Sequence, residues 1–377
     1  MSGGVLFWVQ HLLGSGHLRR TAALAAATAA LGVEATVASG GVPLSHLAMG
    51  GARLVQLQPL RAADASFRTL VDGQGRPADA ALLARRRAEL EALVAGTAPR
   101  VVVTETFPFG RRGLREEALA LLDAASALPG SPLVVASVRD ILQRENRPDR
   151  IAAMIEIAQA RYDAVLVHGD PALIRLEESF PAAALLGERV IHTGYVATPA
   201  AAAADTDDTG CDEVVVSVGG GAVGARLLAV ARQARPLSRL AAGRTWRLLS
   251  GEGGVKDTGE PGIVVEPNRA DFTALLARCA VSVSQAGYNT VTDLFAAGAR
   301  AVLVPFAADG ETEQDDRARR LAERGLAVVV AEDALTPESL AAAVDAALAL
   351  PAPQPGAIAL SGAQTGARLL AEWVRHG

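Results

Sequence analysis

The stretch VSVSQAGYNTVTDLFAAGARAVLV, residues Val281 to Val304, decides the fold of this chain. Its β-branched start predicts a short buried strand, and the small residues Ser284–Gly287 predict a turn. A helix can then run through Ala297 and end at Gly298, before the apolar run Ala301–Val304 returns as a parallel strand. A helix N-terminus presents unpaired N–H groups and the positive end of a dipole. The stretch therefore predicts a βαβ unit whose helix start binds an anion.

The same alternation of apolar strands and helices extends over most of the chain. It predicts parallel, doubly wound sheets, because a strand that is followed by a helix returns parallel to its neighbour. Residues 60–77 are predicted to be irregular. The periodic pattern stops at 197–210, a segment of mostly Ala, Thr and Asp that is typical of a linker, and then restarts.

These patterns predict an α/β chain of two Rossmann-like, doubly wound domains that face each other across a ligand cleft. The last helix, 363–376, is expected to pack back on the first domain. The predicted parts are an N-terminal acceptor domain of residues 1–198, a linker of 199–211 and a C-terminal donor domain of 212–377.

The composition argues against several classes of protein. The chain has 377 residues, of which 50% are hydrophobic and 20% charged, as suits two globular domains. A net charge of −5 gives no support for nucleic-acid binding. The two cysteines, Cys211 and Cys279, have neither metal-ligand nor redox spacing, so we expect no disulfide framework and no zinc site. We predict no metal and no cofactor for this chain. No apolar run reaches the ~20 residues of a membrane-spanning helix, and a cytoplasmic enzyme is expected.

Peripheral membrane contact is not favoured by the sequence. The basic run Arg85–Arg87 lies on a predicted helix beside leucines, but Glu89 and Glu91 follow at once. This mixture of charges predicts a helix with a solvated face.

The first glycine loop, Gly14-Ser15-Gly16-His17, lacks the spacing of a dinucleotide fingerprint. It ends in an imidazole at the start of a helix, where the dipole disfavours the charged form and suits a neutral proton acceptor. Glu105 and Asp140 follow other strands and are rival bases. We therefore take His17 and Glu105 as the catalytic candidates, with a helix-capping histidine as the alternative.

The second half of the chain offers groups for a nucleotide diphosphate. The backbone N–H groups of Gly219–Gly221 can face phosphates, although a flexible turn is the alternative. Thr290 and Asp293 share a helix face, so they can bind a phosphate oxygen and the ribose hydroxyls. Alternatively, Thr290 caps the helix and Asp293 merely favours its dipole. Glu313 and Gln314 can bond sugar hydroxyls, or form a solvated first helical turn.

Several of these motifs resemble a known family. The run SQAGYNTVTDLFAAG from Ser284, then Val304-Pro-Phe and Glu313-Gln314, resembles the donor half of the MurG-like glycosyltransferases of family 28. The glycine loops at Gly14–His17 and Gly219–Gly224 resemble those of the same family. The resemblance implies a GT-B fold and a nucleotide-diphosphate sugar donor, UDP-linked in that family. The implied donor-binding residues are Gly14, Gly16, Gly219, Gly220, Gly221, Ser284, Gln285, Gly287, Tyr288, Asn289, Thr290, Asp293, Phe306, Glu313 and Gln314.

The chain also departs from that family. The family has Glu at the position of Asp293 and two glutamines at Glu313-Gln314. The segment ETFPFGRR, Glu105–Arg112, does not follow the family, so the acceptor (a glycan, a lipid-linked or a small molecule) is not identified.

The resemblance favours an inverting, metal-independent transfer of a hexose or N-acetylhexosamine to an acceptor hydroxyl. Three alternatives stay open. One is a sugar-nucleotide hydrolase of the pseudaminic acid type, whose loop resembles Gly14–Arg20. The others are a nonhydrolysing epimerase and a non-catalytic sugar-nucleotide-binding protein.

Overall fold

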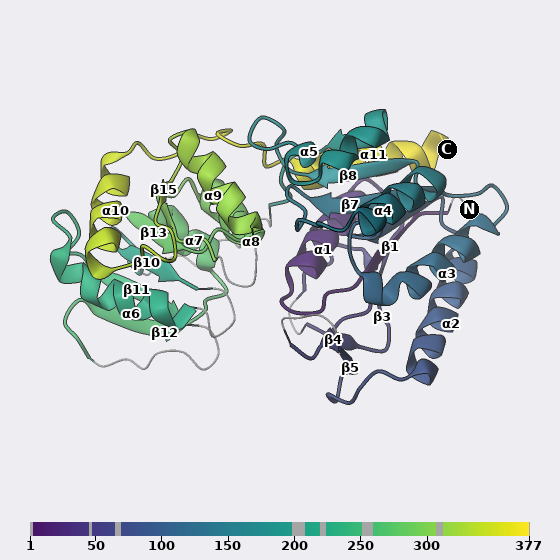
Figure 1. Ribbon diagram of the computed structural model, residues 1–377, viewed down its shortest axis with the longest axis horizontal. Helices are drawn as coiled ribbons and strands as arrows, with labels where there is room; N and C mark the ends of the chain where they lie inside the picture. The colour runs from purple at the N-terminus through teal and green to yellow at the C-terminus, as the bar shows by residue number, and fades with distance from the viewer. Residues whose placement is uncertain are drawn as a thin grey trace. The chain divides into compact units, whose positions relative to one another are not determined.

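The computed structural model describes residues 3–44, 47–64, 69–197, 208–218, 224–250, 259–306 and 312–376. The chain divides into two compact units (Figure 1). The first comprises Met1–Val196 with Ser361–Gly377, and the second comprises Ala197–Leu360.

The first unit is built on a seven-stranded sheet with the order β3-β2-β1-β6-β7-β8-β9, in which all pairs are parallel. Its strands are β1 (Val5–Val9), β2 (Ala35–Ser39), β3 (Arg53–Gln56), β6 (Val101–Glu105), β7 (Leu133–Arg139), β8 (Ala164–His168) and β9 (Val190–His192). Its helices are α1 (Gly16–Ala30), α2 (Ala80–Thr97), η1 (Arg112–Leu114), α3 (Arg115–Ser126), α4 (Pro148–Arg161), α5 (Leu176–Ser179), η2 (Pro181–Arg189) and α11 (Gly362–His376).

Helices cover both faces of this sheet, which is why its central strand, VLFWV, is apolar at every position. Val5 and Phe7 pack in one cluster with residues of α1 and α11. Leu6 and Trp8 point to the other face and pack with residues of α2 and α3. The alternation of side chains along β1 thus supplies two cores from one strand.

Two sequence predictions about the first unit are wrong. Within 60–77, predicted irregular, β4 (Leu60–Ala62) and β5 (Leu70–Asp72) form an antiparallel pair. Strands of three residues are too short to carry a recognisable period. The face of α2 predicted to be solvated also fails at Arg86, which is fully buried. Arg86 lies four residues from Leu82 and from Leu90, on the buried stripe of the helix.

The second unit has a six-stranded parallel sheet with the order β12-β11-β10-β13-β14-β15. The decisive stretch forms a strand, a helix that ends before Gly298 (φ 66°) and a returning strand, as predicted. The strands are β10 (Val214–Ser217), β11 (Trp246–Ser250), β12 (Ile263–Pro267), β13 (Val281–Ser284), β14 (Ala301–Leu303) and β15 (Val328–Val329). The helices are α6 (Gly224–Ala234), η3 (Arg235–Leu237), α7 (Phe272–Arg278), α8 (Tyr288–Ala297), α9 (Glu313–Glu323) and α10 (Pro337–Ala349).

Both sheets contain a point where the strand order reverses direction. It lies between β1 and β6 in the first sheet and between β10 and β13 in the second. In open α/β sheets, ligands bind outside the carboxyl ends of the strands at such a switch point. In each unit, the strand ends beside this point, those of β1 and β6 and those of β10 and β13, are therefore where a ligand is expected.

No helix of the described residues is long and apolar enough to cross a membrane. The last helix, α11, shown in yellow in Figure 1, packs against α1 of the first unit. It begins where the backbone N–H of Gly362 donates to the carbonyl oxygen of Tyr195, 2.9 Å away. A Cβ on Gly362 would overlap the Gly194 carbonyl oxygen and lie 2.7 Å from the Tyr195 carbonyl carbon. Only glycine fits this approach of two backbones.

We predict that Gly362→Ala lowers the free energy of unfolding by about 1–3 kcal/mol, because the added methyl group meets backbone that cannot rotate away. Urea denaturation would measure the change. The matched control is Gly96→Ala in α2, where a Cβ meets nothing within 4 Å. That control should be neutral or slightly stabilising, since alanine favours a helix by up to about 1 kcal/mol over glycine. Equal effects of the two substitutions would contradict the prediction.

Candidate active site

The loop after β1 brings His17 to the switch point of the first sheet. Gly14 adopts a positive φ of 61°, and Gly16 is the first residue of α1. His17 therefore stands in the first turn of the helix, with its side chain 16% exposed. No side chain caps this helix start, so the capping alternative for His17 is not what the structure shows.

Glu105 is the last residue of β6, the strand beside β1. Its side chain is 1% exposed. Its carboxylate Oε1 lies 2.9 Å from Nδ1 of His17. The two residues that the sequence offers as rival bases are thus in direct contact, 88 positions apart in the chain.

Three further groups hold the Glu105 carboxylate. Arg20, one turn along α1 from His17, donates to Oε1 and forms an ion pair with it. Ser137, at the facing position of β7, donates to Oε2 over 2.7 Å. Thr106 contributes a longer contact to Oε1, at 3.4 Å. The buried charge is therefore compensated on both oxygens, as a carboxylate out of water requires.

This environment sets the protonation states of the pair. Burial, helped by the charge of Arg111, lowers the pKa of His17 to about 3. For Glu105, burial alone would raise the pKa, but the charge of Arg20 and the hydrogen bonds from His17 and Ser137 outweigh it. They hold the pKa of Glu105 well below its usual range. Near neutral pH the cluster is a neutral imidazole beside an ionised carboxylate.

An ionised carboxylate can only accept hydrogen bonds, so Nδ1 of His17 carries the proton that it shares with Glu105. The other ring nitrogen, Nε2, makes no hydrogen bond within the described part of the chain. His17 thus presents a lone pair on the one nitrogen that Glu105 does not hold.

Arg111 is a neighbour that the sequence did not single out. It lies in the segment after β6 with a positive φ of 62°, and its Nε donates to the carbonyl oxygen of Gln10, 2.6 Å away. Burial lowers its pKa to about 10. The loop after β6 is thereby tied to the loop after β1, on which His17 stands.

Asp140, the third rival base, belongs elsewhere in the first unit. It is fully buried at the end of β7, and the hydroxyl of Tyr195 donates to its Oδ2 over 2.8 Å. A carboxylate engaged in this way supports the segment that leads out of β9.

In the second unit, the loop between β13 and α8 forms the predicted helix start. Gly287 precedes the helix in an extended conformation, and no side chain caps it. Thr290 and Asp293 are partly exposed on the helix, as are Gln285 and Asn289 nearby. Ser284 is fully buried, and its Oγ has no hydrogen-bond partner among the residues described.

Gln314 and Glu313 tie this loop to the next one. Oε1 of Gln314 accepts from the backbone N–H groups of Ala286 and Phe306, at 3.1 and 3.2 Å. Glu313 is 4% exposed and pairs with Arg317, whose guanidinium also donates to the Ala286 carbonyl. The guanidinium lies 5.8 Å from the centre of the Tyr288 ring. The contact of Glu313 and Gln314 with a sugar stays a prediction. The same holds for every other contact with a donor that the sequence predicts.

The glycines of the second loop, Gly219, Gly220 and Gly221, lie outside the described residues. The linker predicted at 199–211 is described only from residue 208 onward.

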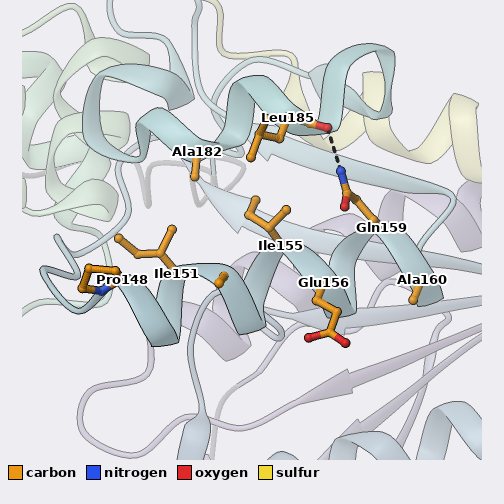
Figure 2. A pocket seen from close by; sticks show the side chains of 9 residues that line it. Pro148, Ile151, Ile155, Glu156, Gln159, Ala160, Ala182 and Leu185 are labelled. Atoms are coloured by element: carbon orange, nitrogen blue, oxygen red, sulfur yellow. Dashed lines mark hydrogen bonds between the residues drawn. The ribbon is translucent and has the colours of Figure 1, made fainter.

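An apolar groove lies away from all of these residues. It runs between α4 and η2 and is lined by Ile151, Ile155, Ala182 and Leu185 among others (Figure 2). The amide of Gln159 donates to the Leu185 carbonyl across one side of it, at 3.1 Å. The groove holds no group that can transfer a proton except Glu156 at its edge, so it is not the candidate site.

Comparison with known proteins assigns the second half of the chain. Residues 215–367 match the family described as the glycosyltransferase family 28 C-terminal domain. A UDP-N-acetylglucosamine–N-acetylmuramyl-(pentapeptide) pyrophosphoryl-undecaprenol N-acetylglucosamine transferase of Methylibium petroleiphilum is 36% identical over 138 residues, which cover 33% of this chain and 37% of the relative. The transferase of the same name from Desulforudis audaxviator is 37% identical over 100 residues, 26% of each chain. The chain thus spans about a third or less of the length of these curated relatives.

Solved structures match over nearly the whole chain. The glycotransferase of kitacinnamycin has a TM-score of 0.63 at 19% identity, covering 99% of this chain and 97% of that one. MurG of Acinetobacter baumannii has a TM-score of 0.58 at 17% identity, covering 99% and 95%. At such identities the likeness speaks for the fold alone. The chain therefore has the GT-B glycosyltransferase fold, and its residues 215–367 are similar to the family 28 C-terminal domain of MurG-like glycosyltransferases, as the stretch around Tyr288 predicts.

Proposed function

We propose that this chain is an inverting glycosyltransferase that moves a hexose or N-acetylhexosamine from a UDP-linked sugar to an acceptor hydroxyl, without a metal. The observation that carries the proposal is the contact between neutral His17 and ionised Glu105 at the switch point of the first sheet. The family 28 match of residues 215–367 supports the donor half. The names of the curated relatives support UDP as the nucleotide.

In this proposal His17 is the general base. Its Nε2 takes the proton of the acceptor hydroxyl while the acceptor oxygen forms a bond to C1 of the sugar. The bond from C1 to the diphosphate breaks on the opposite face, and the configuration at C1 inverts. The imidazolium that forms keeps its Nδ1–H on Glu105, whose negative charge stabilises it.

Glu105 is assigned an orienting role rather than that of the base. Its two oxygens accept from Arg20, His17 and Ser137, and its low pKa makes it a weak proton acceptor. A group whose lone pairs are occupied by protein donors has little capacity left for a substrate proton.

The second unit is assigned the donor. The start of α8 would face the diphosphate, where its N–H groups and dipole stabilise the charge that develops on the leaving group. Thr290 would bond a phosphate oxygen, and Asp293 the ribose hydroxyls. The Oγ of buried Ser284, at the end of the preceding strand, has no hydrogen-bond partner among the described residues and is a further group near this helix start.

The hydrogen bonds of Gln314 limit which of its atoms could contact the sugar. Its Oε1 is occupied by two backbone donors, so its amide N–H group is the part left to reach a sugar hydroxyl. Glu313 is paired with Arg317 in the interior. We therefore assign Glu313 to holding the loop that precedes α8, and Gln314 to the sugar.

A sugar-nucleotide hydrolase is the second candidate, because the His17–Glu105 pair would activate a water as readily as an acceptor hydroxyl. The two functions differ in one product. Incubation of the donor alone releases free sugar at the full rate of turnover if the chain is a hydrolase. A transferase releases it far more slowly than it glycosylates an acceptor.

We predict that a UDP-sugar stabilises the chain against heat, because a ligand at 100 times its Kd adds about 2.7 kcal/mol to the free energy of unfolding. A thermal-shift screen of UDP- and other nucleotide sugars would measure it. Asp293→Ala should weaken binding about 10- to 100-fold through the loss of a charged hydrogen bond. Glu338→Ala, a carboxylate in the first turn of α10 in the same unit, is the control. If no nucleotide sugar raised the melting temperature, the donor assignment would be wrong.

His17→Gln should lower kcat for sugar transfer by about 10²–10⁴-fold, since general-base catalysis contributes that much. The Kd of the donor should stay within about twofold, because the imidazole is assigned to the acceptor step. Initial rates and calorimetric titration with the donor would test both. A variant that keeps near-normal turnover would remove His17 from the mechanism.

The pH dependence follows from the lowered pKa of His17. A base with a pKa of about 3 remains neutral down to mildly acidic pH. We therefore expect kcat/KM to fall less than about twofold between pH 8 and pH 5. A histidine of ordinary pKa, near 6.5, would lose about 30-fold over the same interval. Measurement of kcat/KM across this range would test the expectation, with circular dichroism to check the fold. A fall of kcat/KM on the acid side with a midpoint near pH 6.5 would contradict the lowered pKa of His17.

A further inference from the structure

A second histidine, His168, lies behind the His17–Glu105 pair and is used by nothing in the mechanism above. It ends β8 and is fully buried. Its Nε2 lies 3.0 Å from the hydroxyl of Ser137, the residue that donates to Glu105. Its Nδ1 lies 2.8 Å from the hydroxyl of Thr193. The ends of β6, β7 and β8, with the residue after β9, thus form one buried chain of hydrogen bonds.

We propose that His168 is a positioning residue that acts through Ser137 and Glu105 to fix the tautomer of His17. Its link to catalysis rests on the proposed function, but the hydrogen-bond chain itself does not. The direction of every bond in the chain follows from counting protons.

The count begins at Ser137. Its hydroxyl has one proton, and the 2.7 Å bond to the ionised Oε2 of Glu105 is the stronger use of it, because charge-assisted bonds are about twice as strong as neutral ones. The Ser137 oxygen must then accept at its other contact. His168 is therefore the donor there, and its Nε2 carries the proton.

The count ends at Thr193. Burial lowers the pKa of His168 to about 3, so the ring is neutral and its Nδ1 holds a lone pair. Thr193 satisfies that lone pair by donating over 2.8 Å. The carbonyl oxygens of Gly194 and Val167 lie farther from the same hydroxyl, at 3.1 and 3.3 Å. The donors Thr193, His168 and Ser137 thus each donate to the next group in the series of hydrogen bonds that ends at Glu105.

At the Glu105 end, this chain of hydrogen bonds determines which of two tautomers His17 adopts. With Oε2 held by Ser137, Oε1 of Glu105 stays 2.9 Å from Nδ1 and keeps the proton there. A competitor stands close by, since Nη2 of Arg20 lies 3.2 Å from the same nitrogen. If the carboxylate turned away, Arg20 could donate to Nδ1 and the proton would move to Nε2. That tautomer has no lone pair facing the acceptor.

The surroundings keep this arrangement rigid. Glu105 and Ser137 are register partners on adjacent strands, which fixes their separation. Gly366 of α11 covers the His168 ring, because a Cβ built there would lie 3.8 Å from Cε1. The ring is therefore held by sheet on one side and by the last helix on the other.

The test reads the tautomer directly, without any substrate. Long-range ¹H–¹⁵N correlation spectra of the protein labelled in its 6 histidines report which ring nitrogen carries the proton. The His17 signals are assigned as those lost in His17→Gln. In the wild type we expect a protonated Nδ1 and an unprotonated Nε2.

Ser137→Ala and His168→Phe should each give His17 a measurable population of the tautomer protonated on Nε2. His168→Gln should restore the wild-type pattern, since its amide can donate in place of the imidazole. Ser179→Ala is the control, because Ser179 is a buried hydroxyl of the same unit that bonds the Leu142 N–H outside this chain of bonds. It should leave His17 unchanged.

A His17 that stays wholly protonated on Nδ1 in both Ser137→Ala and His168→Phe overturns the proposal. If His168→Phe does not fold, the Ser137→Ala spectrum decides alone. Kinetics separate this proposal from the proposed function. For a glycosyltransferase, kcat falls about three- to tenfold in both variants while KM for the donor is unchanged. If the tautomer shifts and no sugar is transferred even by the wild type, the proposed function fails and the positioning role stands.

Discussion

The burial of one carboxylate organises the first unit. Glu105 is at the end of a central strand, where water is excluded, and its charge persists only because donors meet both oxygens. Those donors come from α1 and β7, and the next group behind them comes from β8. The requirement to compensate a single charge therefore constrains three separate segments. The hydrogen bond to Glu105 orients the His17 ring, whereas burial and the charge of Arg111 keep its pKa low and the ring neutral.

In the second unit, side chains of α9 hold the loop that precedes α8. The Gln314 amide oxygen accepts from the Ala286 N–H, and the Arg317 guanidinium donates to the Ala286 carbonyl. Because the backbone is held by side chains of α9, the N–H groups at the start of α8 are kept in one orientation. A rigid set of dipoles stabilises a leaving diphosphate better than a flexible one, since no reorganisation is needed during reaction.

The sequence predicted the second unit well, and the reason is physical. The helix start and its Gly298 stop depend on local backbone preferences and on spacing, which a single stretch carries. The confirmed family match covers the same region. The sequence also placed His17 at a helix start and Glu105 at the end of a strand. Their contact, and the part played by Arg20 and Ser137, depend on the order of strands. A pairing across 88 positions leaves no periodic signal in either segment.

The sequence pattern also fails to predict the burial of Arg86, because the partners of this charge lie far away in the sequence. Arg86 was assigned to a solvated face, yet it donates to Glu117, to the Gly40 carbonyl and to Gln10. Arg86 holds the segment after β1 through the Gln10 side chain. The amide of Gln10 in turn donates to the His11 carbonyl. Arg111 holds the same segment from the other side, through the Gln10 carbonyl.

The loop that carries His17 is thus fixed by two arginines whose importance is invisible in composition or periodicity. Arg111 belongs to the segment Glu105–Arg112, which does not resemble the family, whereas residues 215–367 match its C-terminal domain. We infer that the two units hold their loops by different means. In the second unit, Gln314 and Arg317 of the following helix bind the backbone before α8. In the first unit, two arginines from distant segments bind the stretch after β1.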